Sequence, residues 1–557
     1  MPDECKTEIC ELPPLATVER RRRLSRRKAV ANGKSRRLLW SRSIFNFAAV
    51  TKPILIGLDF GTTNLKGICF TATGESLVRM EVQTPRNHPK EDWTEWDPAL
   101  IWETVIKLLQ GLLQRLPSGY IPVGISVASV AESVVGIDKR GHPIGPIIAW
   151  HDRRSEQEAE WLRSQISEEE VFAITGSPID ATFALFKLLW LQRHRPEQFN
   201  AAVHWLFVAD WIAFSLTGEM AASASLASRT LAFEISTLKW SDKILQAAGL
   251  DRLRFAEVRP SGTSIGKVIP EIADQCGLPK DVVVAVGGHD HVCGAIAAGA
   301  VRPGILLDSI GTSEALFAPI AAPTAAARFL RASFCQGVVQ VVRQSPSYYA
   351  IGGMPSAGEC VEWFLSLLQG DQEIESLSNA ASGCDPNRTF FVPHLRYVSS
   401  PTPQRNARGA FFGLTIGTST SQLFRAVLEG IAFEGKYIID NLISMARAEP
   451  VAEIWCVGKA FQNNLFQQIK ANINGVPLRV AEQPDLAARG AAILAGLGAG
   501  TYGSTEEALQ MSRGFWNKRS PEKTLEHEYR QGQVRYNRVR EIVRLLAQEI
   551  YRSELHD

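Results

Sequence analysis

Apolar runs and short polar turns alternate along most of the chain and divide it into strands and helices. Apolar runs that stop at a glycine or a charged residue predict strands at residues 54–59, 67–70, 123–128, 134–138, 146–150, 281–287, 304–309 and 454–457. Apolar positions three and four residues apart predict helices at residues 99–113, 186–192, 205–216, from about 421, and at 466–473, 487–500 and 529–550. Strands and helices thus alternate, as they do in α/β proteins.

The first of these strands ends in a carboxylate that is followed by a glycine-threonine turn. Asp59 ends the apolar run, and Gly61, Thr62, Thr63 and Lys66 come next. Backbone N–H groups, two hydroxyls and an ammonium at one turn can bind an anion, and the carboxylate beside them can hold a hydrated Mg²⁺. An ordinary polar hairpin explains these residues equally well when they are considered alone.

A second glycine-threonine turn, in the later half of the chain, favours the anion site over an ordinary polar hairpin. It follows the apolar strand that ends near Asp308, and it consists of Gly311, Thr312 and Ser313. Two such turns can face each other across a cleft and hold the two ends of a triphosphate. Because both halves open with a strand, a Gly-Thr turn and a strand, we expect an α/β fold with two actin-like (ribonuclease H-like) ATPase domains and a cleft between them.

A further strand end combines two glycines with an acid. The apolar strand at residues 281–287 runs into Gly288, His289, Asp290 and His291, and small residues follow. This arrangement presents Asp290 to a cleft, where a substrate hydroxyl would meet a transferring phosphoryl group. Asp290 is therefore a candidate general base. The alternative is that Asp290 only caps the helix that follows it.

Other polar residues also follow predicted strands. Glu132, Asp152 and Arg154 lie where ligands of open α/β sheets usually bind, whereas Arg153 fits a plain surface position. Gly458 stands between a strand and a helix, and its missing Cβ can let the backbone lie flat against an adenine. A single glycine is a weak signal by itself.

The length and charge of the chain indicate two domains and a distinct N-terminal segment. A chain of 557 residues is too long for one core and favours two domains of about 200–250 residues. Residues 1–51 hold 12 basic and 5 acidic side chains, whereas the remainder is mildly acidic and gives no sign of a nucleic-acid-binding surface. We expect a disordered basic extension at 1–51, an N-terminal domain at 52–295 and a C-terminal domain at 296–557.

Three explanations stay open for the basic extension. It can be an organellar transit peptide, a basic tail for an anionic partner, or the product of a translation start assigned too early. Acids at positions 3, 4, 8 and 11 oppose a transit peptide, so we prefer a dispensable or mis-assigned leader.

The cysteines and the lack of long apolar runs bear on location. Nine cysteines are scattered without a Cys-x-x-Cys pair or a zinc spacing, which favours a reducing compartment and a cytoplasmic protein. We find no apolar run of about 18 residues and no secretory signal pattern, so we expect no membrane span.

Six motifs, in their order and spacing, resemble the FGGY family of carbohydrate kinases. They are residues 59–66 (DFGTTNLK), 150–154 (WHDRR), 287–290 (GGHD), 308–312 (DSIGT), 409–414 (GAFFGL) and 425–430 (RAVLEG). The resemblance extends over residues 54–500. It implies a kinase that uses ATP and Mg²⁺ to phosphorylate a hydroxyl of a small sugar, for example a ketose such as a pentulose, or of a polyol.

The resemblance also implies roles for single positions. Asp59 resembles the carboxylate that holds Mg²⁺ through water, and Asp290 resembles the catalytic base. Positions that resemble nucleotide-binding groups are Gly61, Thr62, Thr63, Lys66, Gly311, Thr312, Gly458 and Gln462. Positions that resemble sugar-contacting groups are Glu132, Trp150, Asp290 and His291.

The acceptor positions depart from the two best-known branches of the family. Ala131 and Glu132 match neither the Arg-Glu pair of glycerol kinases nor the Met-His pair of xylulokinases, and His291 replaces an amide common to both. Ala184 stands where a small polar residue or proline is usual, and Gly458 is a single glycine where two or three are common. A glycerol kinase and a non-catalytic actin-like ATP-binding module are the alternatives. Which sugar is phosphorylated, and whether the protein forms a homodimer, are left open.

Overall fold

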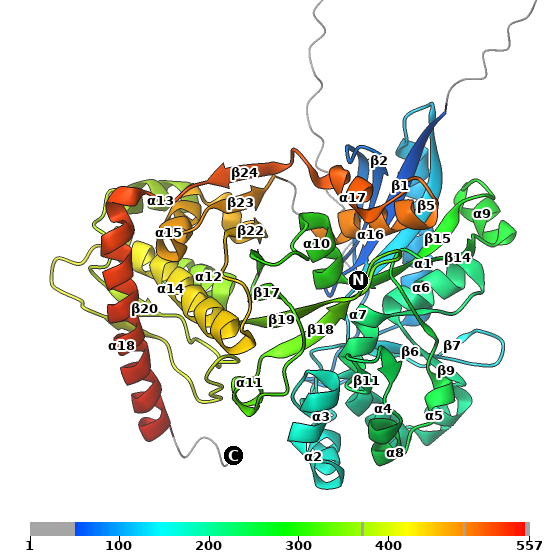
Figure 1. Cartoon of the computed structure of the whole chain (residues 1–557), viewed down its shortest axis with the longest axis horizontal. Coiled ribbons are helices and arrows are strands. Elements are labelled where there is room, and N and C mark those ends of the chain that lie inside the picture. Colours follow the sequence, from blue (N-terminus) through cyan, green and yellow to red (C-terminus); the bar gives the residue numbers. More distant parts are fainter. Residues whose placement is uncertain (1–50, 369–372, 483–484, 552–557) are drawn as a thin grey trace, which may run out of the picture. The chain divides into compact units, whose positions relative to one another are not determined.

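The first half of the chain forms a six-stranded sheet around the first glycine-threonine hairpin (Figure 1). The computed structural model describes residues 51–368, 373–482 and 485–551, so the expected basic extension lies outside it except for Thr51. The strands are β1 Lys52–Phe60, β2 Asn64–Thr71, β3 Ser76–Gln83, β5 Tyr120–Ser129, β14 Ser264–Lys267 and β15 Val283–His289. Their order is β14-β15-β5-β1-β2-β3, and β15, β5 and β1 run parallel. Because parallel strands end at one edge of a sheet, this edge collects the residues that follow them.

The second half repeats this arrangement in a seven-stranded sheet. Its strands are β16 Ile305–Ile310, β17 Glu314–Ile320, β18 Cys335–Val339, β19 Ser347–Met354, β22 Glu453–Val457, β23 Leu478–Ala481 and β24 Trp516–Arg519. The order is β18-β19-β17-β16-β22-β23-β24. The antiparallel hairpin of β16 and β17 carries the second glycine-threonine turn, and β22 lies parallel to β16 as β5 lies parallel to β1.

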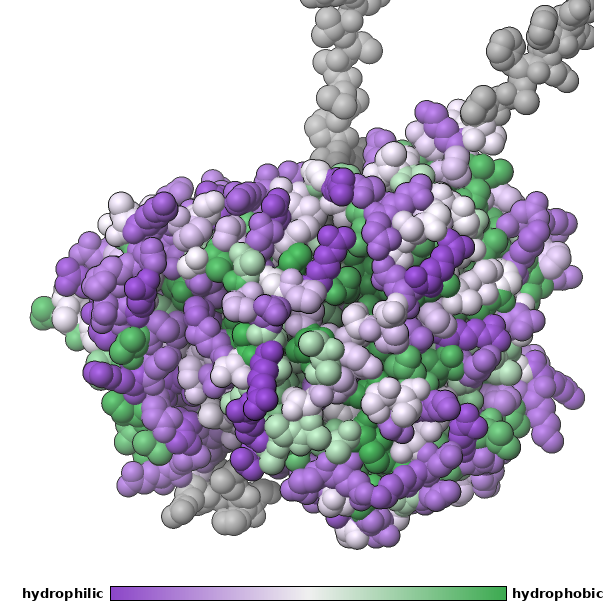
Figure 2. All heavy atoms as spheres, viewed as in Figure 1, coloured by the Kyte–Doolittle hydropathy of each residue, from purple (hydrophilic) through white to green (hydrophobic). Residues whose placement is uncertain are grey.

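Helices cover both sheets. They are α1 Pro98–Arg115, α2 Glu156–Gln165, α3 Glu168–Thr175, α4 Ala184–His194, α5 Pro196–Ala201, α6 Val208–Thr217, α7 Ala224–Ala227, α8 Asp242–Ala248, α9 Pro270–Cys276, α10 Asp290–Ala298, α11 Ala327–Arg331, α12 Ala357–Ser366, α13 Ile374–Ser382, α14 Thr420–Ala446, α15 Asn464–Asn474, α16 Leu486–Gly498, α17 Thr505–Ala508 and α18 Glu526–Ile550. Within the described ranges, none of them combines the length and hydrophobicity that crossing a bilayer requires. The face of the molecule in Figure 2 is mostly hydrophilic, with apolar side chains scattered over it.

Local signals in the sequence explain where the helices begin. The Asp97 carboxylate accepts a 2.8 Å hydrogen bond from the Ala99 N–H at the start of α1, and Pro98 takes the first helical position. Ser419 and Gln422 form a reciprocal capping box at the start of α14.

Short strands complete the layers around the first sheet and the C-terminal helices. They are β4 Glu95–Trp96, β6 Val134–Ile137, β7 Pro143–Ile144, β8 Ile147–Ile148, β9 His204–Phe207, β10 Ala222–Ser223, β11 Phe233–Glu234, β12 Lys239–Trp240, β13 Val258–Arg259, β20 Phe390–Val392 and β21 Ala410–Phe412. The strand expected at 146–150 is thus reduced to the two residues of β8. The expected helix at 205–216 is wrong at its start, because residues 204–207 form β9 and the helix α6 begins at Val208.

Tertiary packing accounts for β9. It pairs antiparallel with β6, with Gly136 opposite Trp205 and Val134 opposite Phe207. Trp205, Leu206 and Phe207 are all buried, so this apolar run packs on both sides of a strand and not along one face of a helix.

Helix α16 belongs to the second half in sequence but packs on the first sheet. A Cβ at Gly57 in β1 would overlap the Ala488 carbonyl of α16, and a Cβ at Gly490 would overlap the Cys293 carbonyl of α10. Glycine at both positions lets the backbones approach closely, as the small residues of α16 predict. Helix α10, which begins with Asp290, is thereby held against α16, which itself lies directly on the sheet.

Candidate active site

Asp59 and Asp290 lie at the ends of two strands that flank β5. In the register of the sheet, Asp59 is opposite Ala128 and His289 is opposite Ser129, so both carboxylates come to the same edge. Burial raises the pKa of Asp59 to about 7, and the charge of Asp290 adds to this rise while Lys66 opposes it. A buried carboxyl group with a second carboxylate nearby gains from a cation, which fits the predicted magnesium ligand at Asp59.

Asp290 is the first residue of α10, and two contacts fix its carboxylate. Its Oδ1 accepts a 2.6 Å hydrogen bond from the His291 backbone N–H, and His289 Nε2 lies 3.1 Å from the same oxygen. Burial alone would raise the pKa of Asp290, but its interactions with His291 and His289 outweigh this effect and hold the pKa at about 2. The carboxylate is therefore ionised at neutral pH. The N-cap position of α10 is His289, with no capping hydrogen bond from a side chain, so the structure does not support a cap role for Asp290 and its role as a base stays a prediction.

The two histidines beside Asp290 affect which ligands the site can hold. His289, Asp290 and His291 bring three possible metal-ligating atoms within 4.8 Å of one another. Imidazoles suit zinc and other transition metals, whereas Mg²⁺ prefers oxygen ligands, so Asp59 fits magnesium better than this group does. Burial lowers the pKa of His291 although Asp290 opposes the shift. A neutral imidazole at this position can exchange hydrogen bonds with a hydroxyl group.

The first glycine-threonine turn is fixed by hydrogen bonds from its own hairpin. The Gly61 N–H donates to the Asn64 carbonyl at 3.0 Å, and the Thr84 N–H donates to the Thr63 carbonyl at 2.8 Å. Thr63 is exposed, and Thr62 receives a hydrogen bond from Trp150 Nε1. Predicted phosphate ligands thus stand at an open turn.

Lys66 has an ionic partner that the sequence did not suggest. It lies opposite Asp59 in the hairpin, as expected, but its Nζ is 3.3 Å from Asp485 Oδ1, just before α16. Asp485 also pairs with Arg79 at 2.7 Å. A phosphate role for Lys66 would use an ammonium that a carboxylate already orients, and it stays a prediction.

The second glycine-threonine turn rests on a buried ionic triad. Gly311, Thr312 and Ser313 are exposed, and a Cβ at Gly311 would meet open space. Beneath the turn, Lys470 pairs with Asp308 at 2.5 Å and with Glu314, and none of the three side chains is exposed. Helix α12 begins against the turn, where the Glu359 N–H donates to the Thr312 carbonyl at 3.2 Å.

A cavity of about 1380 Å³ connects the two turns. Thr63, Gly311 and Thr312 line one part of it, and Gln462 lies on its wall. A nucleotide contact of Gln462 stays a prediction. Apolar side chains that also line it are Ala357, Val361, Leu365, Ile374, Ala460 and Leu465. Polar turns together with an apolar region match the chemistry of a nucleotide, which has a charged tail and a flat base.

Gly458 does not line this cavity. It has a φ of 108°, and a Cβ on it would overlap the Ile310 carbonyl at the end of β16. Packing against the strand that carries the second turn therefore explains why glycine is required here. The proposed contact of Gly458 with adenine stays a prediction.

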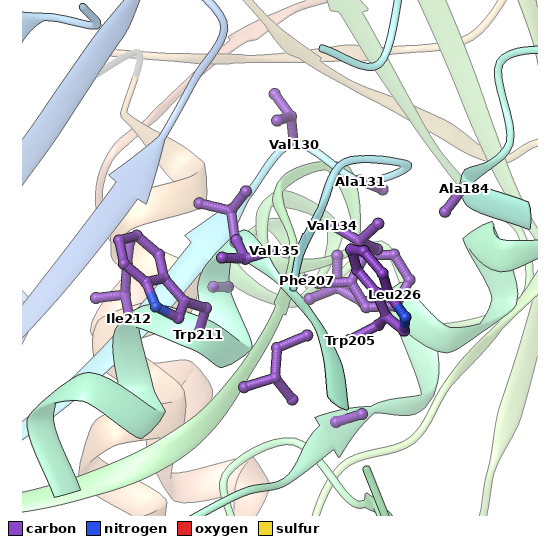
Figure 3. Close-up of a cluster of buried hydrophobic side chains, with 14 of the residues drawn as sticks. Val130, Ala131, Val134, Val135, Ala184, Trp205, Phe207, Trp211, Ile212 and Leu226 are labelled. Atoms are coloured by element: carbon purple, nitrogen blue, oxygen red, sulfur yellow. The ribbon is translucent and has the colours of Figure 1, made fainter. Parts of the chain in front are cut away.

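The predicted acceptor residues come from several strand ends above a buried apolar cluster. Figure 3 shows Val130 and Ala131, which precede Glu132, together with Leu226 of α7 and Trp205 of β9 in this cluster. Glu132 has a left-handed backbone with a φ of 59°, and it pairs with Arg229, which the sequence analysis missed. The charges of both residues influence His291. A shared contact of Glu132 and His291 with the acceptor stays a prediction.

Asp152 and Arg154, which were also expected at a strand end, form buried ion pairs. Arg154 pairs with Asp152 and with Glu95, each at 2.6 Å, and its side chain is almost fully buried. Arg153 is partly exposed and bonds Glu156 at 2.6 Å, in agreement with a surface position. Asp152 and Arg154 therefore neutralise each other's charge and fill each other's hydrogen bonds.

Lys187 fixes the loop that carries Trp150. Its buried Nζ donates to the carbonyl oxygens of Trp150 at 3.2 Å and of Thr182 at 2.5 Å. Burial lowers the pKa of Lys187 to about 8, against the raising effect of Glu132. An ammonium that joins two loops in this way fixes the backbone of Trp150, which is predicted to contact the acceptor.

Arg229 could have been noticed in the sequence. It is the only charged residue between positions 221 and 233, among small and apolar residues. A lone cation in such a segment tends to have a buried partner, but the sequence does not indicate that Glu132, 97 positions earlier, is this partner.

Family comparison decides the class of protein. Residues 54–297 match the N-terminal domain and residues 306–499 the C-terminal domain of the "FGGY family of carbohydrate kinases". The chain belongs to this family. It is therefore a kinase that transfers a phosphoryl group from ATP to an alcohol group of a sugar or polyol. The predicted family and enzyme class are confirmed.

Sequence relatives of this FGGY kinase include two kinds of kinase. The xylulose kinase of Staphylococcus xylosus is 26% identical over 499 residues, which cover 85% of this chain and 97% of the relative. The glycerol kinase of Gloeobacter violaceus is 30% identical over 468 residues, which cover 83% and 91%.

Solved structures confirm the expected fold of this FGGY kinase. A ligand-bound xylulose kinase from Lactobacillus acidophilus matches with a TM-score of 0.80 at 22% identity, over 88% of this chain and 98% of that one. Plasmodium falciparum glycerol kinase with ADP matches with a TM-score of 0.81 at 22% identity, over the same shares. The two-domain actin-like architecture predicted from the repeated hairpins is therefore correct.

Proposed function

We propose that this FGGY kinase phosphorylates a small neutral sugar, a ketose such as a pentulose, and that Asp290 is its general base. One observation carries this proposal: an ionised carboxylate, fixed by His289 and the His291 N–H, lies at the same sheet edge as Asp59 and the first phosphate turn. A base in this position can take the proton of a hydroxyl group as the hydroxyl oxygen attacks phosphorus.

The nucleotide would occupy the cavity between the two glycine-threonine turns. Gly61, Thr62, Thr63 and Lys66 would contact the phosphates from one side and Gly311 and Thr312 from the other. Gln462 would lie nearer the base, and Gly458 would act by fixing the end of β16 beside the second turn. Asp59 would hold a hydrated Mg²⁺. When bound, this ion would neutralise charge on the phosphates. The N–H groups of the two turns would contribute to the same stabilisation.

The acceptor would lie against Trp150, between Glu132 and His291. Glu132 can accept hydrogen bonds from hydroxyl groups, and the neutral His291 ring can donate or accept one. The relatives include both xylulose kinases and glycerol kinases, and a ketose chain offers more hydroxyl groups to this set than glycerol does. We therefore favour a pentulose, with glycerol as the alternative outcome.

Acceptor-dependent ADP release tests the proposal. The purified protein is assayed with ATP and Mg²⁺ against ketopentoses, aldopentoses, pentitols and glycerol. We expect a ketopentose to give the highest kcat/KM, whereas a preference for glycerol would replace the pentulose assignment. ADP release that no acceptor stimulates would contradict the proposed reaction.

Substitution of Asp290 tests the proposed base. We expect Asp290→Asn to lower kcat about 100-fold or more, within the range known for a positioned base. Asp281→Asn is the matched control, because Asp281 precedes the same strand and makes only an exposed ion pair with Lys267. Near wild-type turnover of Asp290→Asn would refute the role of Asp290.

Location and assembly are further expectations. We propose a cytoplasmic protein, which the need for ATP and the free cysteines at positions 69, 276, 293, 335, 360, 384 and 456 support. A homodimer stays a prediction, and sedimentation of the purified protein would test it.

A further inference from the structure

Arg229 is a buried cation at the acceptor side of the site. It lies in the short 3-10 turn Ser228–Thr230 that follows α7, and its side chain is 14% exposed. Its Nε donates to Glu132 Oε1, and its guanidinium lies 4.7 Å from the centre of the Phe183 ring. A guanidinium held by a carboxylate and an aromatic ring has a fixed orientation.

The segment that carries Arg229 is attached to the strand end that carries Asp290. The His289 N–H donates a 3.1 Å hydrogen bond to Ser225 Oγ in α7, and a Cβ at Gly288 would press on the same oxygen. Ser228 Oγ in turn donates to the Ala224 carbonyl at 2.7 Å. The position of Arg229 is therefore coupled to that of Asp290 through a few short contacts.

Polar residues from both halves of the chain interact electrostatically with Arg229. Burial lowers the pKa of His291, and Glu132 raises it while Arg229 lowers it further. Burial raises the pKa of Tyr349 in β19 to about 12, and both Arg229 and Asp290 affect it. The Tyr349 hydroxyl is buried and has no hydrogen-bond partner in the described part of the chain. The charge of Arg229 thus acts on His291 and Tyr349 as well as on its ion-pair partner Glu132.

We propose that Arg229 is a specificity-determining residue, which together with Glu132 binds the hydroxyl-bearing chain of the acceptor. This inference rests on the proposed function. The guanidinium donates to acceptor oxygens, and the Glu132 carboxylate accepts from acceptor hydroxyls. Because the two charges cancel, the pair favours a neutral sugar or polyol over an acceptor that carries a carboxylate.

Because Glu132 and Arg229 balance each other's charge, removing the charge of Glu132 should change the acceptor specificity. In Glu132→Gln the side chain keeps its shape but loses its charge, so Arg229 becomes an uncompensated cation. Such a cation attracts an anionic acceptor. We expect the ratio of kcat/KM for D-gluconate or D-xylonate to kcat/KM for the best neutral acceptor to rise about tenfold or more. An unchanged ratio would overturn the role of charge balance.

Variants of Arg229 give the second measurement. We expect Arg229→Met to raise the acceptor KM about tenfold or more while the KM for ATP stays within about twofold, because the lost hydrogen bonds are made to the acceptor. Arg229→Lys keeps the charge but loses the planar fork, so its acceptor KM should be intermediate. Arg259→Met is the control, since Arg259 makes only a partly exposed pair with Glu257.

The outcomes separate this inference from the proposed function. A wild-type protein without acceptor-dependent ADP release would refute the proposed function itself. An active wild type combined with an acceptor KM that Arg229→Met leaves within about twofold would overturn only the role of Arg229. If Arg229→Met does not fold, the double variant Glu132→Gln/Arg229→Met leaves no buried charge unpaired, and its acceptor KM is compared with that of Glu132→Gln. An acceptor KM within about twofold of Glu132→Gln would then overturn the role of Arg229.

Discussion

Trp150 Nε1 donates a 2.8 Å hydrogen bond to Thr62 Oγ1. This bond joins the predicted acceptor wall to the first phosphate turn. The Trp150 carbonyl accepts from the buried Lys187 ammonium at 3.2 Å, so the residue is held at its backbone and at its ring. A side chain attached to both binding regions can set the distance between the two reactants, and small errors in that distance are costly for phosphoryl transfer.

We expect Trp150→Phe to lower kcat roughly 3- to 10-fold, because one net hydrogen bond contributes about 0.5–1.5 kcal/mol. The melting temperature should change little, since the indole is 37% exposed. Thr62→Val removes the same bond from the other side. In a double-mutant cycle on kcat, the two effects should not add. Additive effects would show that the bond does not couple the acceptor wall to the turn.

Asp59 should make the stability of the free protein depend on pH. Its pKa is about 7 in the folded chain, above its ordinary value of 3.8. The unfolded chain releases this proton first, so the stability that Asp59 contributes is present below about pH 4 and is lost as pH rises through about 7. Asp59→Asn should remove this loss. We expect the variant to exceed the wild type in melting temperature at pH 8 in EDTA, and to fall near it at pH 4.5.

Magnesium provides the control for this prediction. Binding of Mg²⁺ with ADP at pH 8 should raise the melting temperature of the wild type more than that of Asp59→Asn, because an ionised carboxylate holds the cation. Equal shifts in both proteins would argue against Asp59 as a magnesium ligand.

The sequence was sufficient to predict features that depend on neighbouring residues. Both glycine-threonine hairpins were predicted because an apolar strand, a turn and a second strand follow one another directly. The start of α10 at Asp290 was predicted for the same reason. Features that depend on distant partners were missed. Glu132 and Arg229 are 97 positions apart, and periodicity within either segment does not reveal their contact.

Long-range packing also explains the errors in the helices and strands. The run of apolar residues at 205–207 fits a helix locally, but pairing with β6 makes it a strand. The Ala/Gly composition of α16 indicated close packing, yet only the fold shows that its partners are β1 and α10 of the other half. Local propensity is weak compared with such tertiary contacts.

Gly458 should be needed for the position of the second turn. We expect Gly458→Ala to raise the dissociation constant for ADP about tenfold or more and to lower the melting temperature, because its Cβ would displace the Ile310 carbonyl from the end of β16. Calorimetric titration with ADP measures the first effect. Gly475→Ala is the control: Gly475 also has a positive φ but has no atom near its Cβ position. It should lose about 1 kcal/mol of stability without a change in ADP affinity.

Lys470 should stabilise the second turn through its two carboxylates. Lys470→Met leaves Asp308 as a buried charge without its partner, which costs about 3–5 kcal/mol. The triple variant with Asp308→Asn and Glu314→Gln removes all three ionisable groups, so it should recover much of this loss. Urea unfolding of the three proteins measures both effects. Equal stability of the single and triple variants would show that the charges are not coupled.

The same triad predicts that the protein loses stability as pH rises toward about 8. Burial raises the pKa of Glu314 to about 8, against the lowering effect of Lys470. Since the ordinary value is 4.5, the stability that Glu314 contributes is present at low pH and is lost as pH rises through about 8. We expect the free energy of unfolding of the wild type to fall between about pH 5 and 8 more steeply than that of Glu314→Gln. Parallel pH profiles of the two proteins would mean that Glu314 does not titrate in this range.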